Sequence, residues 1–210
     1  MQNIFQSAVL VLSWLGPKSQ TLELAMKTVH TIGKEVEKIG GVVESFEPFI
    51  SHSDLWHINT ENGTRNHAWR SIDDLLECDY WNRVWIVQEI SLASSCFIMV
   101  GDIFLELSLL LNFGAFLNAL SSGVLSPKRP YPDVLPYIAI PGIFNTMVIT
   151  RIEVFRSGPQ AIDPLLRLRA TQPCLATDPR DKLYAILPVE YSGLVADTLN
   201  LLRKCIWNLP

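Results

Sequence analysis

The chain has 210 residues, the length of one domain of ordinary size. Hydrophobic residues make up 49 % of it and charged residues 18 %, a balance that excludes an intrinsically disordered chain. The formal net charge of −4 lacks the basic excess of a general nucleic-acid-binding protein. The longest apolar runs, at 8–15 and 138–149, fall short of the roughly 20 residues that cross a bilayer. The sequence therefore predicts neither a nucleic-acid partner nor a membrane span.

The first predicted element is a strand at residues 8–12. The run is apolar, contains β-branched residues and is followed by Gly-Pro at 16–17. This pattern favours a strand that is buried on both faces, as in a parallel sheet with helices on each side. Apolar residues then recur every three or four positions over 22–39, which predicts an amphipathic helix ending at the Gly-Gly pair at 40–41.

Three features are predicted in the middle of the chain. The polar segment 51–66 indicates a surface loop, and Asn66 can cap a helix at 69–76. Residues 80–90 have an ambiguous hydrophobic period, for which a buried helix is the favoured interpretation. Two short apolar runs separated by Gly-Asp predict a β-hairpin at 97–106.

The C-terminal half is predicted to be mainly helical. Residues 107–120 have a helical pattern, and five of the 13 prolines fall in the following loop at 127–141. Asp-Pro pairs at 163–164 and 178–179 predict two helix starts, with the aspartate as the cap and the proline as the first helical residue. Pro188 is expected to end the second of these helices. Together the elements predict an α/β fold, a mostly parallel sheet flanked by helices.

The cysteines indicate a reducing compartment. They are scattered among apolar or mixed neighbours and form no C-x-x-C pair, which favours buried free thiols over a disulfide framework. They are Cys78, Cys96, Cys174 and Cys205. No basic region follows Met1, so no secretory signal is visible and a cytoplasmic protein is expected.

No metal or phosphate motif is present in the sequence. His52, His57 and His67 are spaced by five and ten residues, which matches no tight zinc-ligand pattern, and they are interpreted as solvated loop histidines. The sequence contains no glycine-rich phosphate loop and no G-x-S-x-G nucleophile elbow. We therefore expect no metal and no bound cofactor.

The densest group of chemically functional side chains lies between positions 80 and 89. Trp81, Arg83, Trp85, Gln88 and Glu89 crowd two aromatic rings, a cation, an amide and a carboxylate into a few positions. In a functional interpretation Glu89 is an acid, a base or a hydroxyl-binding group, and apolar neighbours raise its pKa. In a structural interpretation Arg83 pairs with Glu89 or stacks on a tryptophan ring. The sequence leaves both interpretations open.

The segment 177–181, T-D-P-R-D, also has two interpretations. Asp178 can cap a helix that Pro179 starts, and Asp181 then lies in the first turn, where the helix dipole favours a negative charge. Arg180 is left free to pair with a carboxylate or to bind an anion. We expect either Arg83 or Arg180 to meet Glu89 in the folded chain.

These segments resemble the fungal heterokaryon-incompatibility (HET) domain. Residues 1–17 are similar to the family's "M-x-x-I-Y-x-x-A … W-L-G" strand. Residues 80–90, YWNRVWIVQEI, are similar to its "W-x-R-x-W-x-x-Q-E" core, and 176–187, ATDPRDKLYAIL, to its "T-D-P-R-D-K-x-Y-A-L-L" ending. The matching residues are Trp81, Arg83, Trp85, Gln88, Glu89, Asp178, Pro179, Arg180, Asp181 and Tyr184.

The resemblance also implies a domain organisation. It covers residues 1–190, which are interpreted as a partial HET domain, followed by a helical tail at 191–210. The family's "L-S-Y-x-W-G" and "W-I-D-x-x-C-I-N-Q" strand motifs are absent, so an N-terminal truncation and an incomplete sheet are expected. A buried strand without its neighbours would account for the mean hydropathy of +0.22.

By resemblance, the function is nonself recognition linked to fungal programmed cell death. A comparison of the family with TIR domains implies an alternative, a TIR-like enzyme that cleaves NAD, with Glu89 nominated as the catalytic carboxylate and NAD as its substrate. A second alternative is a non-catalytic adaptor that self-associates or binds other proteins of the incompatibility response. A third is a non-functional fragment.

Overall fold

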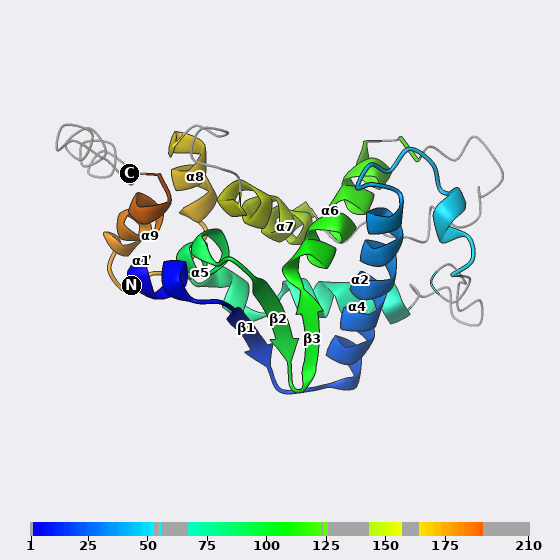
Figure 1. Cartoon of the computed structure of the whole chain (residues 1–210), viewed down its shortest axis with the longest axis horizontal. Coiled ribbons are helices and arrows are strands. Elements are labelled where there is room, and N and C mark those ends of the chain that lie inside the picture. Colours follow the sequence, from blue (N-terminus) through cyan, green and yellow to red (C-terminus); the bar gives the residue numbers. More distant parts are fainter. Residues whose placement is uncertain are drawn as a thin grey trace.

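The computed structural model describes residues 2–52, 55, 67–122, 124–125, 143–156 and 164–190. Within these residues the chain forms a three-stranded sheet flanked by helices, which confirms the predicted α/β class (Figure 1). The helix cap predicted at Asn66, the proline-rich loop and the helical tail lie outside the described residues. In the part of the chain that the structure describes, no helix combines the length and apolar character needed to cross a bilayer.

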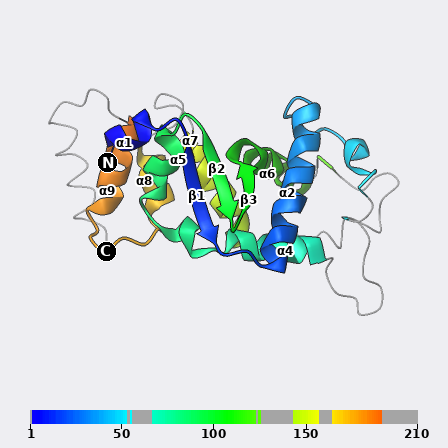
Figure 2. The same ribbon diagram turned by 60° about the horizontal axis from the view of Figure 1, so that its bottom comes forward.

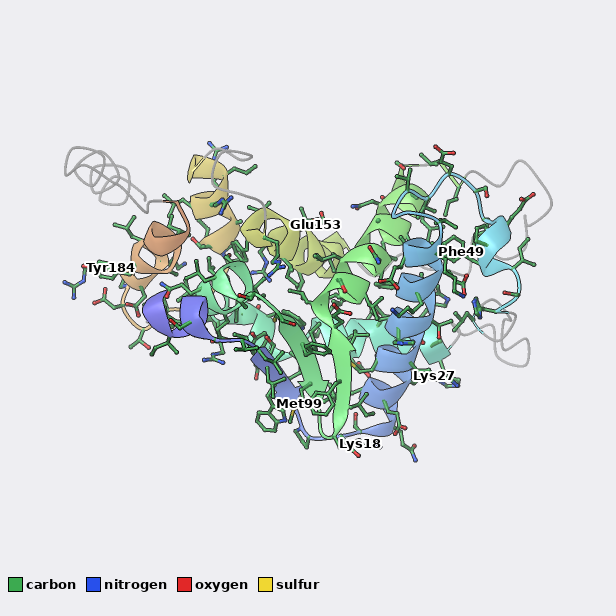
Figure 3. All side chains as sticks on the ribbon, in the orientation of Figure 1. Lys18, Lys27, Phe49, Met99, Glu153 and Tyr184 are labelled. Carbon is green, nitrogen blue, oxygen red and sulfur yellow. The ribbon has the colours of Figure 1, made fainter. Side chains whose placement is uncertain are left out.

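The sheet is mixed, with the strand order β1-β2-β3. The strands are β1 (Val11–Gly16), β2 (Cys96–Val100) and β3 (Ile103–Glu106). Strands β1 and β2 are parallel, whereas β2 and β3 form an antiparallel hairpin, as predicted for 97–106. The hairpin turn requires Gly101, because its φ is +57° and an added Cβ would lie 2.6 Å from the Cβ of Lys18. Lys18 and the hairpin turn lie at the same end of the sheet (Figure 3).

The prediction of a first strand buried on both faces is wrong. The strand begins at Val11 rather than at residue 8, and its side chains alternate between buried and exposed. Ser13 is 1 % exposed, whereas Leu12 is 48 % and Trp14 57 % exposed. The reason is that the described helices cover one face of the sheet: in Figure 2 the strands lie in front of α6 and α7, with no described helix in front of them.

The helix predicted from the periodicity at 22–39 is α2 (Gln20–Lys38). The Ser19 hydroxyl caps it by accepting the Leu22 N–H at 3.2 Å. The helix ends at the predicted pair, Gly40 and Gly41, whose φ angles of +81° and +83° favour glycine. Helix α2 packs against α4 (His67–Leu76) and α6 (Leu107–Ser121), which correspond to the helices predicted at 69–76 and 107–120.

The segment predicted as one buried helix at 80–90 is instead two short helices. These are the 3₁₀ helix η2 (Asp79–Asn82) and α5 (Ile86–Leu92). Arg83 lies between them in extended conformation and forms an isolated parallel bridge with Leu175. The hydrophobic period of residues 80–90 could not show that the helix is interrupted at Arg83, because Leu175, the residue that pairs with Arg83, lies more than 90 positions away.

The remaining described helices are α1 (Gln2–Ser7), the 3₁₀ helix η1 (Glu47–Phe49), α7 (Ile143–Arg156), α8 (Pro164–Thr171) and α9 (Asp181–Glu190). Of these, three contact α5, one packs against α7 and α9, and one 3₁₀ helix packs against α2. Helix α5 contacts α1, α7 and α9. Helix α8 begins at the proline of the first Asp-Pro pair, as predicted. Helix α9 begins two residues after the second pair and extends past Pro188, so the expectation that Pro188 ends it is wrong.

Candidate functional site

The carboxylate of Glu89 lies in a hydrogen-bonded group that joins η2, α5 and β1. The Tyr80 hydroxyl lies 2.8 Å from Glu89 Oε2 and 2.7 Å from Ser13 Oγ. A hydroxyl carries one proton and an ionised carboxylate only accepts, so Tyr80 donates to Glu89 and Ser13 donates to Tyr80. Cys96 Sγ lies 3.5 Å from Ser13 Oγ and extends the group to β2.

The electrostatics of this group keep Tyr80 neutral. Burial is the largest cause that raises the pKa of Tyr80, and the nearby charge of Glu89 raises it further. Burial also raises the pKa of the Cys96 thiol. A protonated tyrosine and a protonated thiol are hydrogen-bonding groups rather than nucleophiles, so this arrangement holds Glu89 in place.

Glu89 meets a cation, as expected, and that cation is Arg83. The guanidinium Nη2 lies 3.8 Å from Glu89 Oε1, and the guanidinium carbon lies 5.8 Å from the centre of the Tyr80 ring. The Glu89 side chain is 14 % exposed and the Arg83 side chain is 57 % exposed. Arg180 does not join this group: its Nε donates to Asp178 Oδ1 and its Nη2 donates to Asp178 Oδ2, a bidentate pair.

The two tryptophans of the motif have different environments. Trp81 is fully buried, donates its indole N–H to Leu75 O at 2.8 Å and packs edge-on against Tyr80 at 5.2 Å between ring centres. Trp85 is half-buried, packs against the core and directly precedes α5. Both rings therefore position the backbone that carries Arg83 and Glu89.

The fold brings the two predicted motif clusters together. Val84 N–H donates to Leu175 O at 3.2 Å, so the segment before α5 pairs with the segment before T-D-P-R-D. About one helical turn further along, in α5, the side-chain amide of Gln88 donates to Tyr184 O in α9 at 2.9 Å. Figure 1 shows α5 and α9 side by side at the end of the molecule where the chain begins.

The T-D-P-R-D segment forms a turn that starts α9. Asp178 Oδ1 accepts the Arg180 N–H at 2.9 Å, and Asp178 O accepts the Asp181 N–H at 2.9 Å. The bonds from Arg180 hold the pKa of Asp178 below its ordinary value. Asp181 opens the helix, where its negative charge suits the dipole. Each motif residue here has a structural partner or position.

Two arginines that the sequence did not single out, the buried Arg151 and the exposed Arg156, also support this region. Arg156 donates to Ile90 O at 3.0 Å and Ala93 O at 3.1 Å, the free carbonyls at the end of α5. Arg151 donates to Trp81 O at 3.3 Å and reaches Cys174 Sγ at 3.5 Å. No local sequence signal marks the two arginines. The carbonyls that accept from them lie more than 60 positions earlier in the chain, and Cys174 lies 23 positions after Arg151.

The described residues contain no group of three His, Cys, Asp or Glu side chains that could hold a metal ion. His52 Nε2 lies 3.2 Å from Glu35 Oε1, which also accepts from Lys38 at 2.8 Å. His67 begins α4, and His57 lies outside the described residues. Cys96 and Cys174 are buried free thiols and Cys78 is half-buried.

A second candidate site is the uncovered face of the sheet. Side chains that are paired in register point to the same side, so Leu12, Phe97 and Glu106 form one row and Trp14, Met99 and Phe104 the next. We call the apolar members of these rows the open face: Leu12, Trp14, Phe97, Met99 and Phe104. Phe104 is 53 % exposed, Met99 is labelled in Figure 3, and no described helix lies over the face in Figure 2.

Residues 1–89 match the family model described as Heterokaryon incompatibility protein (HET). The match confirms the resemblance proposed from the motifs in this part of the chain, and it runs from α1 to the Glu89 carboxylate. It ends before 176–187, where the resemblance rests on the motif and on its packing against α5. Comparisons with curated proteins and with solved structures gave no match.

Proposed function

We propose that this chain acts in heterokaryon incompatibility as an effector domain of nonself recognition linked to fungal programmed cell death, and that it acts by binding protein through the open face. The family match supports the role in heterokaryon incompatibility. The matched residues 1–89 include β1, which contributes to the open face. The observation that carries the second part is the apolar, uncovered character of the sheet on the side of Trp14 and Phe104.

The physical argument is that parallel strands normally have both faces covered. Strands β1 and β2 are parallel, yet Leu12 and Trp14 are about half exposed. An exposed aromatic side chain leaves on the order of 100 Å² of apolar surface in water, and clusters of several such side chains mark interaction sites. A binding partner that covers this face would remove that surface from water.

The alternative function, NAD cleavage with Glu89 as the catalytic group, is favoured by one observation. Glu89 is a partly buried carboxylate beside a neutral hydroxyl, an arrangement that general acid–base chemistry also uses. Against it, Tyr80 and Arg83 both engage the Glu89 carboxylate, so its two oxygens already have structural partners. We therefore favour binding over catalysis.

The experiment expresses the full chain in a filamentous fungus and measures cell viability and the NAD level. Phe104→Asp puts a charge on the open face and is expected to abolish cell death. The matched control is Val42→Asp, since Val42 is 64 % exposed and lies in the loop after α2, away from the sheet. Glu89→Gln keeps the size of the side chain and is expected to keep cell death.

Two outcomes would contradict the proposal. If Phe104→Asp still kills cells, the open face is not the binding surface. If Glu89→Gln spares the cells and the NAD level while remaining folded by circular dichroism, the enzyme alternative replaces the proposal. The two results involve separate residues, so they are told apart in one set of strains.

A further inference from the structure

Strand β1 is an edge of the sheet in the described part of the chain. Val11 N–H donates to Ser95 O at 2.9 Å, so Val11 and Ser13 direct their backbone groups towards β2. Because backbone direction alternates along a strand, Leu12 and Trp14 direct their N–H and C=O groups outwards, away from β2. These outward groups can pair with a further strand.

The edge lacks the features that prevent strand addition. Proteins protect such edges with charged residues, proline or bulges. Residues 7–16 contain no charged residue and no proline. The register irregularity of β1 lies between Trp14 and Gly16, so residues 11–14 remain regular.

We propose that a second copy of this chain pairs with β1 in the antiparallel direction, about a two-fold axis at Ser13; this rests on the proposed function, in which the sheet binds protein. Leu12 then lies opposite Trp14 of the second copy. By symmetry, Trp14 lies opposite Leu12 of the second copy. All four residues direct their backbone groups outwards, so each of these two pairs exchanges both hydrogen bonds. The side chains of Leu12 and Trp14 of the second copy pack side by side on the same side of the sheet.

Charge and area favour a second copy as the occupant. A two-fold axis brings residues close to it near their own counterparts, so a charge there would face the same charge of the second copy, and β1 has none. Val9 is 87 % and Leu10 45 % exposed, and together with Leu12 and Trp14 they extend the contact along the edge. We estimate roughly 600 Å² buried per copy, about 1,200 Å² in total, at the lower limit for a specific interface.

The first experiment is sedimentation equilibrium of the full chain over a wide concentration range. The wild type is expected to dimerise, and Trp14→Lys to raise the dissociation constant at least tenfold, because lysine protects a sheet edge. Phe104→Lys is the matched control: it charges an equally exposed aromatic residue on the far strand, β3, and is expected to stay within twofold of the wild type. Either a monomeric wild type or an equal loss in Phe104→Lys would overturn the proposal.

The second experiment tests the register. Opposite residues of a hydrogen-bonded antiparallel pair have Cα atoms about 5.5 Å apart, within the range of a disulfide. Chains with Leu12→Cys and chains with Trp14→Cys are mixed and mildly oxidised, with the wild type as the control for the natural cysteines. The mixture is expected to form more cross-linked dimer than either variant alone; equal cross-linking in one variant alone would overturn the register.

The outcomes separate this proposal from the proposed function. A monomeric wild type whose cell-death activity is lost in Phe104→Asp would overturn the second copy and leave the function standing. If the dimer is cross-linked as expected but the Phe104→Asp variant still kills cells, the proposed function is overturned and the pairing with a second copy stands.

Discussion

Tyr80 is the residue that connects the first strand to the motif helix. Its hydroxyl joins Ser13 in β1 to Glu89 in α5, and its ring packs on Trp81. Removal of a hydroxyl that bonds to a charged group leaves both partners short of a hydrogen bond in a poorly hydrated place. The position of Glu89 therefore depends on a residue just outside the motif pattern.

Tyr80→Phe is expected to lower the free energy of unfolding by about 1–3 kcal/mol, measured by urea denaturation. Tyr184→Phe is the matched control, because Tyr184 is 48 % exposed, and it should change stability by less than about 0.5 kcal/mol. Equal effects of the two variants would contradict the role of the Tyr80 hydroxyl.

The same variant predicts a pH dependence. The pKa of Tyr80 in the folded chain is raised above the ordinary value of 10.0, so the unfolded chain releases this proton first. Stability from the neutral tyrosine is therefore complete below about pH 10 and is lost above it. The stability difference between wild type and Tyr80→Phe should narrow above pH 10 in denaturation experiments; a constant difference would contradict the raised pKa.

Sequence reasoning could find Glu89 and Arg83 at this scale, because the two are close in the chain and opposite in charge. It could not find Ser13, a polar residue in an apolar run whose partner lies 67 positions away. The contacts of Arg156 with the end of α5 were hidden for the same reason.

At the scale of elements, Gln88 and Pro188 explain how α9 continues past a proline. In a helix, the N–H of residue 188 would bond to the carbonyl of Tyr184, but proline has no N–H. The Gln88 amide donates to that carbonyl instead, at 2.9 Å. The glutamine of one motif thus compensates for the proline that follows the other.

This predicts an energetic coupling between the two residues. Gln88→Leu should destabilise the chain by about 1–3 kcal/mol, because it leaves the partly buried carbonyl of Tyr184 without its side-chain donor. In a chain that also carries Pro188→Ala, the backbone N–H of residue 188 can donate to the carbonyl of Tyr184. Gln88→Leu should therefore be less destabilising in that chain. A double-mutant cycle by chemical denaturation measures the difference, expected at about 0.5–2 kcal/mol; strictly additive effects would contradict the coupling.

Helices with a clear period and a defined end were predicted well, as for α2, which ends at the predicted pair Gly40 and Gly41. The hairpin was predicted because Gly101 marks its turn. The elements that were predicted incorrectly, β1 and the 80–90 segment, depend on neighbours distant in sequence: β1 on which face the helices cover, and Arg83 on its bridge to Leu175.

At the scale of the whole molecule, close contact between α2 and α6 joins the N-terminal part to the helix after the hairpin. An added Cβ at Gly33 of α2 would lie 2.5 Å from the backbone oxygen of Leu109, and the Asn112 side chain donates to Gly33 O at 3.3 Å. Gly114 of α6 also lacks room, but there the neighbour is a side-chain methyl group of Ile149. Backbone cannot rotate aside as a side chain can.

Gly33→Ala is therefore expected to destabilise the chain by about 1–3 kcal/mol despite the better helix propensity of alanine. Gly114→Ala is the matched variant, and its effect should be smaller because Ile149 can change rotamer. Thermal unfolding of both variants tests this, and a stabilised Gly33→Ala would show that α2 and α6 do not approach so closely.

The sequence by itself determined the α/β class, the amphipathic helices, the hairpin and the family resemblance, because each depends on residues close together in the chain. Only the tertiary structure decided that β1 has one open face, that Glu89 is held by Tyr80 and Arg83, and that the two motifs meet through Gln88 and Tyr184. The physical reason is that hydrophobic periodicity reports which side chains avoid water, whereas the surface that covers them comes from segments far away in the sequence.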